Sequence, residues 1–325
     1  MTMAGNQVIS VDRLVKRYGV LTAVDSVSFG VARGEVFGLL GPNGAGKTTI
    51  ISILSCLIPP TSGSATICGC DVVRDSLEVR SRIGVVPQEI ALYQSLSARD
   101  NLVFWGRMYG VTGSALTARI DELLDVVGLK ERAGQRIDTF SGGMKRRINI
   151  AVGLLHRPEV LFLDEPTVGI DPQTRRSILD LVKDLNSQGL TIVYTTHYLE
   201  EAEFLCHRVG VAHEGRLIAV GTKQELIDSI GAADYVVVRA GGLSDAVVAT
   251  VGALPNVAGV ALAENELKIE VVSGSTVLPA LVETLTRERI DVQSIDVVTP
   301  SLETVFLHLT GRSLRESGKG VSEEP

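Results

Sequence analysis

The chain has 325 residues, a formal charge of −7 and an isoelectric point near 5.4, and 45% of it is apolar and 21% charged. This length suits two domains with buried cores, and the acidic balance disfavours a broad surface for nucleic acid. Four cysteines without a C-x-x-C pair argue against a disulfide framework. The N-terminus has no apolar core of signal-peptide length, and no stretch offers the ~18 uninterrupted apolar residues of a membrane span, so we expect a cytosolic chain.

The N-terminal part is predicted to form strands that lead into a glycine-rich loop. Residues 8–19 alternate apolar and polar positions, and residues 24–42 contain two or three strand-like runs, the last of which enters "GPNGAGKTT". A mostly apolar helix is predicted from Lys47 to Ile58, where Pro59 and Pro60 end it. A buried strand, a flexible loop and a buried helix therefore follow one another.

The loop fits the pattern G-x-x-x-x-G-K-[ST] with Gly41, Gly46, Lys47 and Thr48. Glycine allows successive backbone N–H groups to surround a phosphate, and the helix N-terminus adds a favourable dipole. A glycine-rich turn without function is disfavoured because the whole pattern seldom arises by chance. We predict that Lys47 holds the β- and γ-phosphates of a nucleotide and that Thr48 holds a Mg²⁺ ion.

The middle of the chain alternates helices with apolar strands. Helices are expected over 98–110 and 115–129 and after residue 143, and strands over 159–166 and 190–197. Between these strands, a helix begins at Asp171 and Pro172 and ends at Gly189. This order predicts a mostly parallel sheet that is covered on both faces, with ligands at the carboxyl ends of its strands.

Three side chains are predicted to meet at that edge of the sheet. Asp164 would hold Mg²⁺, and Glu165 would polarise an attacking water. His197 ends the next strand, where it would bond a γ-phosphate or orient Glu165. Two carboxylates at a strand end are common by themselves, but the phosphate loop favours a functional interpretation.

A second anion-binding helix terminus is predicted at "FSGGMKRR", where Ser141 caps a helix that starts with two glycines. One nucleotide does not need two such termini. Two copies related by a two-fold axis would explain the surplus, because each copy would offer its second terminus to the nucleotide of the other. Residues 145–147 are basic, and we interpret them as a solvated face rather than a nucleic-acid patch.

The pattern changes after about Gly231. Residues 234–298 predict the order β-α-β-β-α-β of a ferredoxin-like α+β domain, and residues 301–310 a short closing helix. The domains predicted are therefore residues 1–230, with a helical part at about 90–145, then residues 231–310, and a flexible tail at 311–325.

Six motifs, in this order, resemble those of the ATP-binding cassette family. They are Walker A "GPNGAGKTT", the glutamine of "VVPQE", the signature "SGGM", Walker B "VLFLDEP", the D-loop "GIDP" and the switch histidine of "TTHYLEEAE". The resemblance covers residues 8 to about 225. It implies an α/β P-loop NTPase cassette with a parallel core sheet, an antiparallel β subdomain and a helical insert, with the ferredoxin-like domain after it.

The resemblance also implies roles for single residues. Tyr18 would stack on adenine, Gln88 would sense Mg²⁺ and the membrane partner, residues 141–144 would contact the γ-phosphate of the opposite subunit, and Asp171 would couple the two sites. Met144 departs from the family's usual glutamine, which leaves the side-chain contact at this position open, while the backbone donors of Gly142 and Gly143 would remain. The nucleotide-binding set is Tyr18, Gly41, Pro42, Asn43, Gly44, Ala45, Gly46, Lys47, Thr48, Thr49, Gln88, Ser141, Gly142, Gly143, Met144 and Asp171; the metal set is Thr48, Gln88 and Asp164; and the catalytic set is Glu165, His197 and Lys47.

Three further stretches, "SGGMKRR", "TVGIDP" and "SLETVFLHLTG", are similar to cassettes that power ABC-2-type exporters, including daunorubicin-resistance and nodulation-type systems. This implies an ATPase subunit that forms a homodimer around ATP and Mg²⁺ at the cytoplasmic face of the membrane. The partner would be a separate integral membrane permease that contacts the small-molecule cargo, and no nucleic acid is expected.

Several alternatives stay open. A soluble cassette acting on DNA or ribosomes is disfavoured because only 53 positions, without sustained heptads, separate Gln88 from Ser141, and each motif occurs once. The C-terminal domain is either a small-ligand sensor, a dimer brace or a partner dock. Tyr18 can also be a half-buried strand residue, and Phe104, Trp105 and Tyr109 pack inside the helical insert or line a groove for the membrane subunit.

Overall fold

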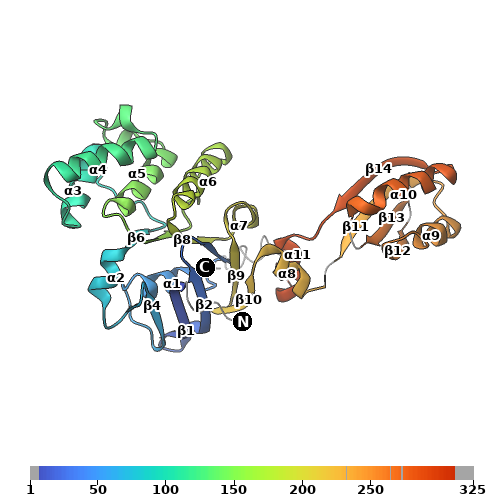
Figure 1. Cartoon of the computed structure of the whole chain (residues 1–325), viewed down its shortest axis with the longest axis horizontal. Helices are drawn as coiled ribbons and strands as arrows, with labels where there is room; N and C mark the ends of the chain where they lie inside the picture. Colours follow the sequence, from blue (N-terminus) through green and yellow to red (C-terminus); the bar gives the residue numbers. More distant parts are fainter. Residues whose placement is uncertain (1–6, 232, 264, 272–273, 312–325) are drawn as a thin grey trace, which may run out of the picture. The chain divides into compact units, whose positions relative to one another are not determined.

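A computed structural model of the protein describes residues 7–231, 233–263, 265–271 and 274–311 (Figure 1). Within these ranges the chain forms two compact units, which divide between Lys223 and Gln224; the second unit reaches Gly311. The sequence predicted this division at residue 230. The flexible tail predicted for residues 311–325 lies outside the described residues, apart from Gly311.

A six-stranded sheet forms the centre of the first unit. Five of its strands are parallel, and β10 pairs antiparallel with β9 at one edge. Every residue of β3, β7 and β8 is buried, as expected for parallel strands that are covered on both faces. The predicted, mostly parallel sheet is thus confirmed. In spatial order the strands are β10 (Arg216–Gly221), β9 (Arg208–His213), β3 (Val36–Leu40), β8 (Thr191–Thr196), β7 (Val160–Asp164) and β6 (Ile83–Val86).

Two apolar cores cover the two faces of this sheet. Leu161 and Leu163 of β7 belong to the core that is shared with the helical insert and α6 (Pro172–Ser187), whereas Val160 and Phe162 belong to the core shared with α1 (Lys47–Leu54). This division follows from the two-residue period of a strand, which points successive side chains to opposite faces.

An antiparallel sheet lies against the second of these cores, as the family resemblance implied. Its alternating strands bury one face, so that Ile9, Val11 and Leu14 of β1 enter the core. The order of its strands is β2 (Leu21–Ala32), β1 (Gln7–Tyr18), β4 (Ser62–Ile67) and β5 (Cys70–Asp71), and α2 (Ser76–Arg82) follows β5.

Helix α1 is shorter than predicted. It ends at Leu54 rather than at Ile58, because Cys56 adopts a left-handed conformation with φ of 58°. The amide of Leu57 then donates to the carbonyl of Ser52, and the amide of Cys56 to that of Ile53, which is the hydrogen-bond pattern of a Schellman C-cap. The side chain of Leu57 is therefore left exposed instead of extending the apolar helix surface.

The helical insert contains α3 (Ala98–Met108), α4 (Gly113–Val126) and α5 (Gly142–Leu154), which Figure 1 draws as one group beyond β6. Two 3₁₀ turns, Lys130–Arg132 and Ile137–Thr139, join α4 to α5. Trp105 packs against the core and meets Phe104 edge to face, while Tyr109 stacks on His156. These contacts favour the interpretation of the three aromatic residues as packing of the insert.

The second unit contains the predicted β-α-β-β-α-β order. Its four strands are all antiparallel and lie in the order β12-β13-β11-β14, which places the first strand between the third and the fourth as in a ferredoxin-like domain. The elements are α8 (Lys223–Ser229), β11 (Asp234–Gly241), α9 (Asp245–Gly252), β12 (Val257–Ala263), β13 (Glu266–Val271), α10 (Gly274–Arg287), β14 (Asp291–Val298) and α11 (Leu302–Thr310).

Candidate functional site

The loop between β3 and α1 is shaped by glycine. Gly46 has φ of 92°, and a Cβ atom at this position would lie 2.4 Å from the carbonyl oxygen of Ala23 in β2. Any other residue would therefore be both strained and too close to β2. Gly46 is also the N-cap of α1 and supplies no side-chain bond, which leaves the first amides of the helix available to an anion.

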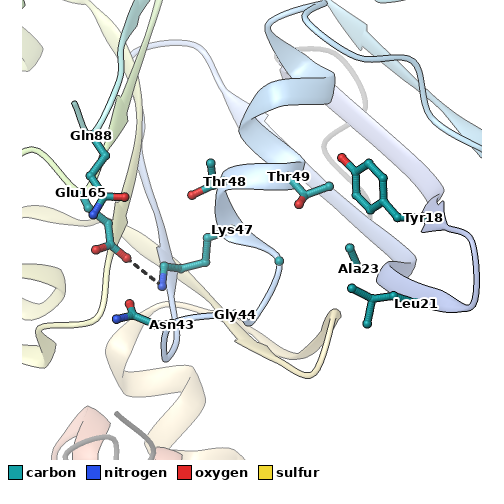
Figure 2. Close-up of a pocket in the computed structure, with 11 residues that line it drawn as sticks. Tyr18, Leu21, Ala23, Asn43, Gly44, Lys47, Thr48, Thr49, Gln88 and Glu165 are labelled. Carbon is teal, nitrogen blue, oxygen red and sulfur yellow. Dashed lines mark ion pairs between the residues drawn. The ribbon is translucent and has the colours of Figure 1, made fainter. Parts of the chain in front are cut away.

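The loop curls around the ammonium group of Lys47. This side chain is only 4% exposed, and Nζ donates to the carbonyl oxygens of Gly41 at 2.7 Å and of Pro42 at 3.0 Å. Nζ also lies 3.0 Å from Oε1 of Glu165, an ion pair drawn as a dashed line in Figure 2. The cation is thus held by the loop on one side and by the end of β7 on the other.

Glu165 occupies an unusual backbone conformation. Its φ is 43°, in the left-handed region that non-glycine residues seldom adopt, directly after the last residue of β7. The amide of Glu165 donates to Oγ1 of Thr195 at 2.9 Å, and Oγ1 of Thr195 donates to Oδ1 of the buried Asp164 at 2.6 Å. Thr195 in β8 therefore fixes the carboxylate of Asp164 and the backbone of Glu165.

The carboxylate of Glu165 lies between two cationic or polar partners. Nδ1 of His197 is 3.2 Å from Oε2, opposite the Lys47 contact. Burial by itself would raise the pKa of Glu165, but the hydrogen bond to His197 and the charge of Lys47 outweigh it and lower the pKa to about 2. The structure thus brings together all three residues of the predicted catalytic set.

A cavity of about 490 Å³ opens beside this cluster. Figure 2 shows Gln88 and Glu165 on one side of the loop, with Tyr18, Leu21 and Ala23 on the other. Tyr18 is 49% exposed, so this strand residue is half-buried, and the part of its side chain that remains accessible lines the cavity. The residues that line the cavity are Tyr18, Leu21, Ala23, Asn43, Gly44, Gly46, Lys47, Thr48, Thr49, Gln88 and Glu165.

The predicted metal ligands supply oxygen donors near this cavity. Thr48 and Gln88 line it, and the carboxylate of Asp164 is buried one residue before Glu165, with Oδ1 fixed by Thr195. A hydroxyl, an amide carbonyl and a carboxylate are the hard ligands that Mg²⁺ prefers, and waters or phosphate oxygens complete its shell. The chemistry of this donor set therefore fits the predicted ion.

The second helix terminus forms as predicted. Ser141 is the N-cap of α5, and its hydroxyl oxygen accepts a hydrogen bond from the amide of Met144 at 3.3 Å. The side chain of Met144 packs partly against the core of the insert. Residues 141–144 and Asp171 are not among the described residues that line the cavity. Within one chain, this terminus therefore takes no part in the cavity beside Lys47.

Asp171 caps α6 as predicted, because Oδ1 accepts from the amide of Thr174 at 2.9 Å. Hydrogen bonds from the beginning of this helix lower the pKa of Asp171, and the hydrogen bond from the amide of Thr174 has the largest effect. The signature segment touches the same turn, since a Cβ atom on Gly143 would lie 2.0 Å from Cγ2 of Thr174. Gly143 thus permits α5 to approach the beginning of α6.

We expect Gly143→Ala to lower the free energy of unfolding by about 1–3 kcal/mol, because the new methyl group overlaps Cγ2 of Thr174. Thr174→Ser removes that atom and retains the amide that Asp171 caps, so it should restore much of the loss. Urea denaturation of both single variants and the double variant measures the coupling. Gly142→Ala is the matched control, since a Cβ atom there meets nothing within 4 Å. Simple additivity of the two changes would contradict this close contact.

The sequence interpretation of residues 145–147 as a solvated face is wrong for Arg146. Arg146 is 4% exposed, and its guanidinium donates to the carbonyl oxygens of Pro87 and Gln88 at 2.7 and 2.5 Å. Arg147 is partly buried and donates to the carbonyl of Val127 and to the hydroxyl of Ser177. Arg146 therefore connects helix α5 to the segment that contains Gln88.

Sequence reasoning also missed Thr195 and Glu201. The threonines that precede His197 in "VYTTH" were a signal for the first, because a hydroxyl beside the end of β7 can bond the carboxylate of Asp164 and the amide of Glu165. Nothing in the local pattern separated Glu201 from its exposed neighbour Glu200; only the fold buries one of them.

Two family models match the chain, one described as ABC transporter over residues 24–168 and the other as ATP-binding protein DrrA1-3-like, C-terminal domain, over residues 221–310. The chain is 46% identical to the linearmycin resistance ATP-binding protein LnrL of Bacillus subtilis, covering 95% of this chain and 100% of the relative. It is 42% identical to the daunorubicin resistance ATP-binding protein DrrA3 of Streptomyces coeruleorubidus, covering 94% and 97%.

A solved structure of similar fold is the dimeric, post-hydrolysis state of the ATP-binding cassette MJ0796, bound to ADP and Pi. Its TM-score is 0.60 at 28% identity, over 66% of this chain and 98% of that one. The similarity therefore extends over a length that corresponds to the first unit alone.

Proposed function

Because the chain belongs to the ABC transporter family of ATP-binding proteins, we propose that it works as a homodimer around two ATP–Mg²⁺ and drives export through a separate membrane permease. Its family makes the chain an ATPase. The observation that carries the proposal is the divided site: the loop, Glu165 and His197 lie together, while the anion-binding terminus at Ser141 does not line their cavity. A second copy would supply the missing part.

Lys47 and the amides of the loop bind the phosphates. The loop already holds the ammonium group of Lys47 beside Glu165, so an arriving γ-phosphate competes with that carboxylate for the same cation. When Lys47 turns to the phosphates, Glu165 loses a positive neighbour and gains a negative one, and both changes raise its pKa. Nucleotide binding thus makes Glu165 a stronger base than it is while paired with Lys47.

Glu165 then takes a proton from the water that attacks the γ-phosphorus, while the bond to the β–γ bridging oxygen breaks and ADP leaves. His197 keeps its contact with Oε2 and orients the carboxylate toward the water. Thr48, Gln88 and Asp164 would hold Mg²⁺, which would supply positive charge to neutralise the β- and γ-phosphates. The exposed ring of Tyr18 lies at the other end of the cavity, where adenine stacks on it.

The partner copy closes the site from the opposite side. The amides that follow its Ser141 would contact the γ-phosphate, and its Asp171 would couple the two nucleotides through the start of α6. Because Gly143 and Thr174 are in close contact, the signature segment and this turn should move together when the dimer forms. The dimeric state of MJ0796 with ADP and Pi supports this arrangement.

The transport step is assigned to another chain. No helix in the described ranges is long and apolar enough to cross a membrane. The relatives named above are ATP-binding proteins of resistance systems, so we propose that this chain lies on the cytoplasmic face of the membrane and drives a small or amphipathic molecule outward. The cargo would contact the permease rather than this chain.

Purification from membranes tests the proposal. We expect a multi-span membrane protein to co-purify with the tagged chain after extraction in mild detergent. The complex of the two proteins should hydrolyse ATP faster when an amphipathic cargo is added. A neighbouring open reading frame that encodes about six spans of ~20 apolar residues would be the first candidate for co-expression. Recovery of the active chain only from the soluble fraction, or together with ribosomes or DNA, would favour the soluble-cassette alternative and overturn the export function.

A further inference from the structure

A buried carboxylate that the mechanism above does not use lies behind the site. Glu201 is in α7 (Leu199–Leu205) and is 1% exposed. Oε1 accepts a hydrogen bond from Oγ1 of Thr167 at 2.6 Å, and Oε2 accepts from the hydroxyls of Tyr194 at 2.9 Å and Thr196 at 2.7 Å. Nε of Arg175 lies 3.5 Å from Oε1. Three hydroxyl donors and one cation therefore converge on a single side chain.

These partners come from the segments that carry the candidate catalytic residues. Thr167 lies two positions after Glu165, and Thr196 is the residue immediately before His197. Arg175 belongs to the first turn of α6, and its amide donates to the carbonyl of Asp171. Glu201 thus joins the segment from Glu165 to Asp171 with the end of β8.

Other contacts strengthen the connection to His197. The guanidinium of Arg175 lies 4.2 Å from the ring centroid of Tyr198, and the rings of Tyr198 and His197 are 4.1 Å apart. The amide of Tyr198 donates to Oγ1 of Thr196, the same hydroxyl that donates to Glu201. Arg175 therefore touches both the buried carboxylate and the residue that follows His197.

Burying such a carboxylate is costly unless every partner is retained. Hydrogen bonds to a charged acceptor are stronger than neutral ones, so the network holds its members in one arrangement. Glu165 requires this support, because its left-handed conformation persists only when the surroundings determine it. Thr195 holds its amide, and Glu201 holds Thr167, whose carbonyl accepts from the amide of Ile170.

We propose that Glu201 is a positioning residue for ATP hydrolysis, which fixes the segment of Glu165 and Asp171 against the segment of His197. The inference rests on the proposed function. Because Arg175 follows the cap of Asp171, displacement of α6 by the partner copy would reach His197 and Glu165 through this carboxylate. Glu201 touches neither water nor nucleotide in this role.

The test compares Glu201→Gln with Glu200→Gln, in which the neighbouring, exposed residue of the same helix loses the same charge. Both variants are made in the full chain and assayed with its membrane partner. The amide retains the shape of glutamate but cannot accept from all three hydroxyls and attract Arg175. We expect kcat to fall roughly ten- to a hundredfold, because small misplacement of catalytic groups has effects of that size, with KM for ATP changed less than about twofold.

A double variant separates positioning from general damage. In the Glu165→Gln background the base is already absent, so adding Glu201→Gln should change the remaining turnover little, as expected for residues that act as a unit. Further loss by the same factor would contradict the inference. If the wild-type complex is active and kcat is equal in Glu201→Gln and Glu200→Gln, the inference about Glu201 is overturned and the proposed function stands. An inactive wild-type complex would instead refute the proposed function.

A milder variant decides the question if Glu201→Gln does not fold. Tyr194→Phe removes a single hydroxyl donor to Oε2 and leaves the carboxylate with Thr167, Thr196 and Arg175. We expect a fall in kcat of about two- to fivefold at constant KM. Unchanged kcat in Tyr194→Phe would overturn the inference.

Discussion

Glu165→Gln should reduce ATP turnover by a factor of about 10² or more while ATP binding stays intact, as expected when a general base is lost. The amide fills the same space and keeps a hydrogen-bonding group near His197, but it cannot accept a proton from water. Steady-state turnover and equilibrium binding of ATP, measured on the same preparation, give the two quantities separately.

The ion pair between Glu165 and Lys47 provides a further expectation for this variant. In the wild type the carboxylate of Glu165 pairs with the ammonium of Lys47, so ATP has to displace it. Without that competitor, affinity for ATP should equal or exceed that of the wild type. The matched control is Glu200→Gln, which removes one exposed carboxylate from the same unit. Turnover close to wild type in Glu165→Gln would reject the assignment of the base.

Lys47→Ala is expected to weaken ATP binding by roughly 10²-fold, since a charge-assisted contact with the phosphates contributes about 1.5–3 kcal/mol. Turnover should fall at least as much, because the same contact holds the γ-phosphate in place. Titration with ATP under conditions of no turnover and a saturating kinetic assay check both effects.

The same substitution should also destabilise the chain in the absence of nucleotide. It leaves the buried carboxylate of Glu165 without its cation and removes the donor to the carbonyls of Gly41 and Pro42. Breaking a buried pair in this way costs about 3 kcal/mol. The double variant Lys47→Ala, Glu165→Gln should recover part of this loss in urea denaturation, because the buried charge is gone, but it should recover no ATP binding. Normal nucleotide consumption by Lys47→Ala would refute the phosphate site.

Much of the site was accessible from the sequence because its parts are local. The turn from Gly41 to Thr48 depends on glycines and a lysine that are close along the chain, and the caps at Ser141 and Asp171 depend on residues three positions away. The order of strands and helices followed from apolar periodicity in both units. The end of helix α1 is the exception among these local features. The residue in the left-handed conformation that ends it is Cys56 rather than a glycine, so the sequence did not predict the position of this end.

Only the tertiary structure decided which of the charged groups meet. Lys47 and Glu165 are 118 positions apart in the sequence and form an ion pair because β3 and β7 both flank β8. Arg146 lies in a basic run that predicted a solvated face, yet the packing of α5 buries it against the carbonyls around Gln88. Glu200 and Glu201 are the same residue type in adjacent positions of α7. Because adjacent residues of a helix point in different directions, Glu200 is exposed to solvent, whereas Glu201 is buried and accepts hydrogen bonds from three hydroxyl groups. Periodicity identifies which faces of helices and strands are apolar. A buried charge, however, is stable only beside partners that the folded chain brings from distant segments, and periodicity does not identify those partners.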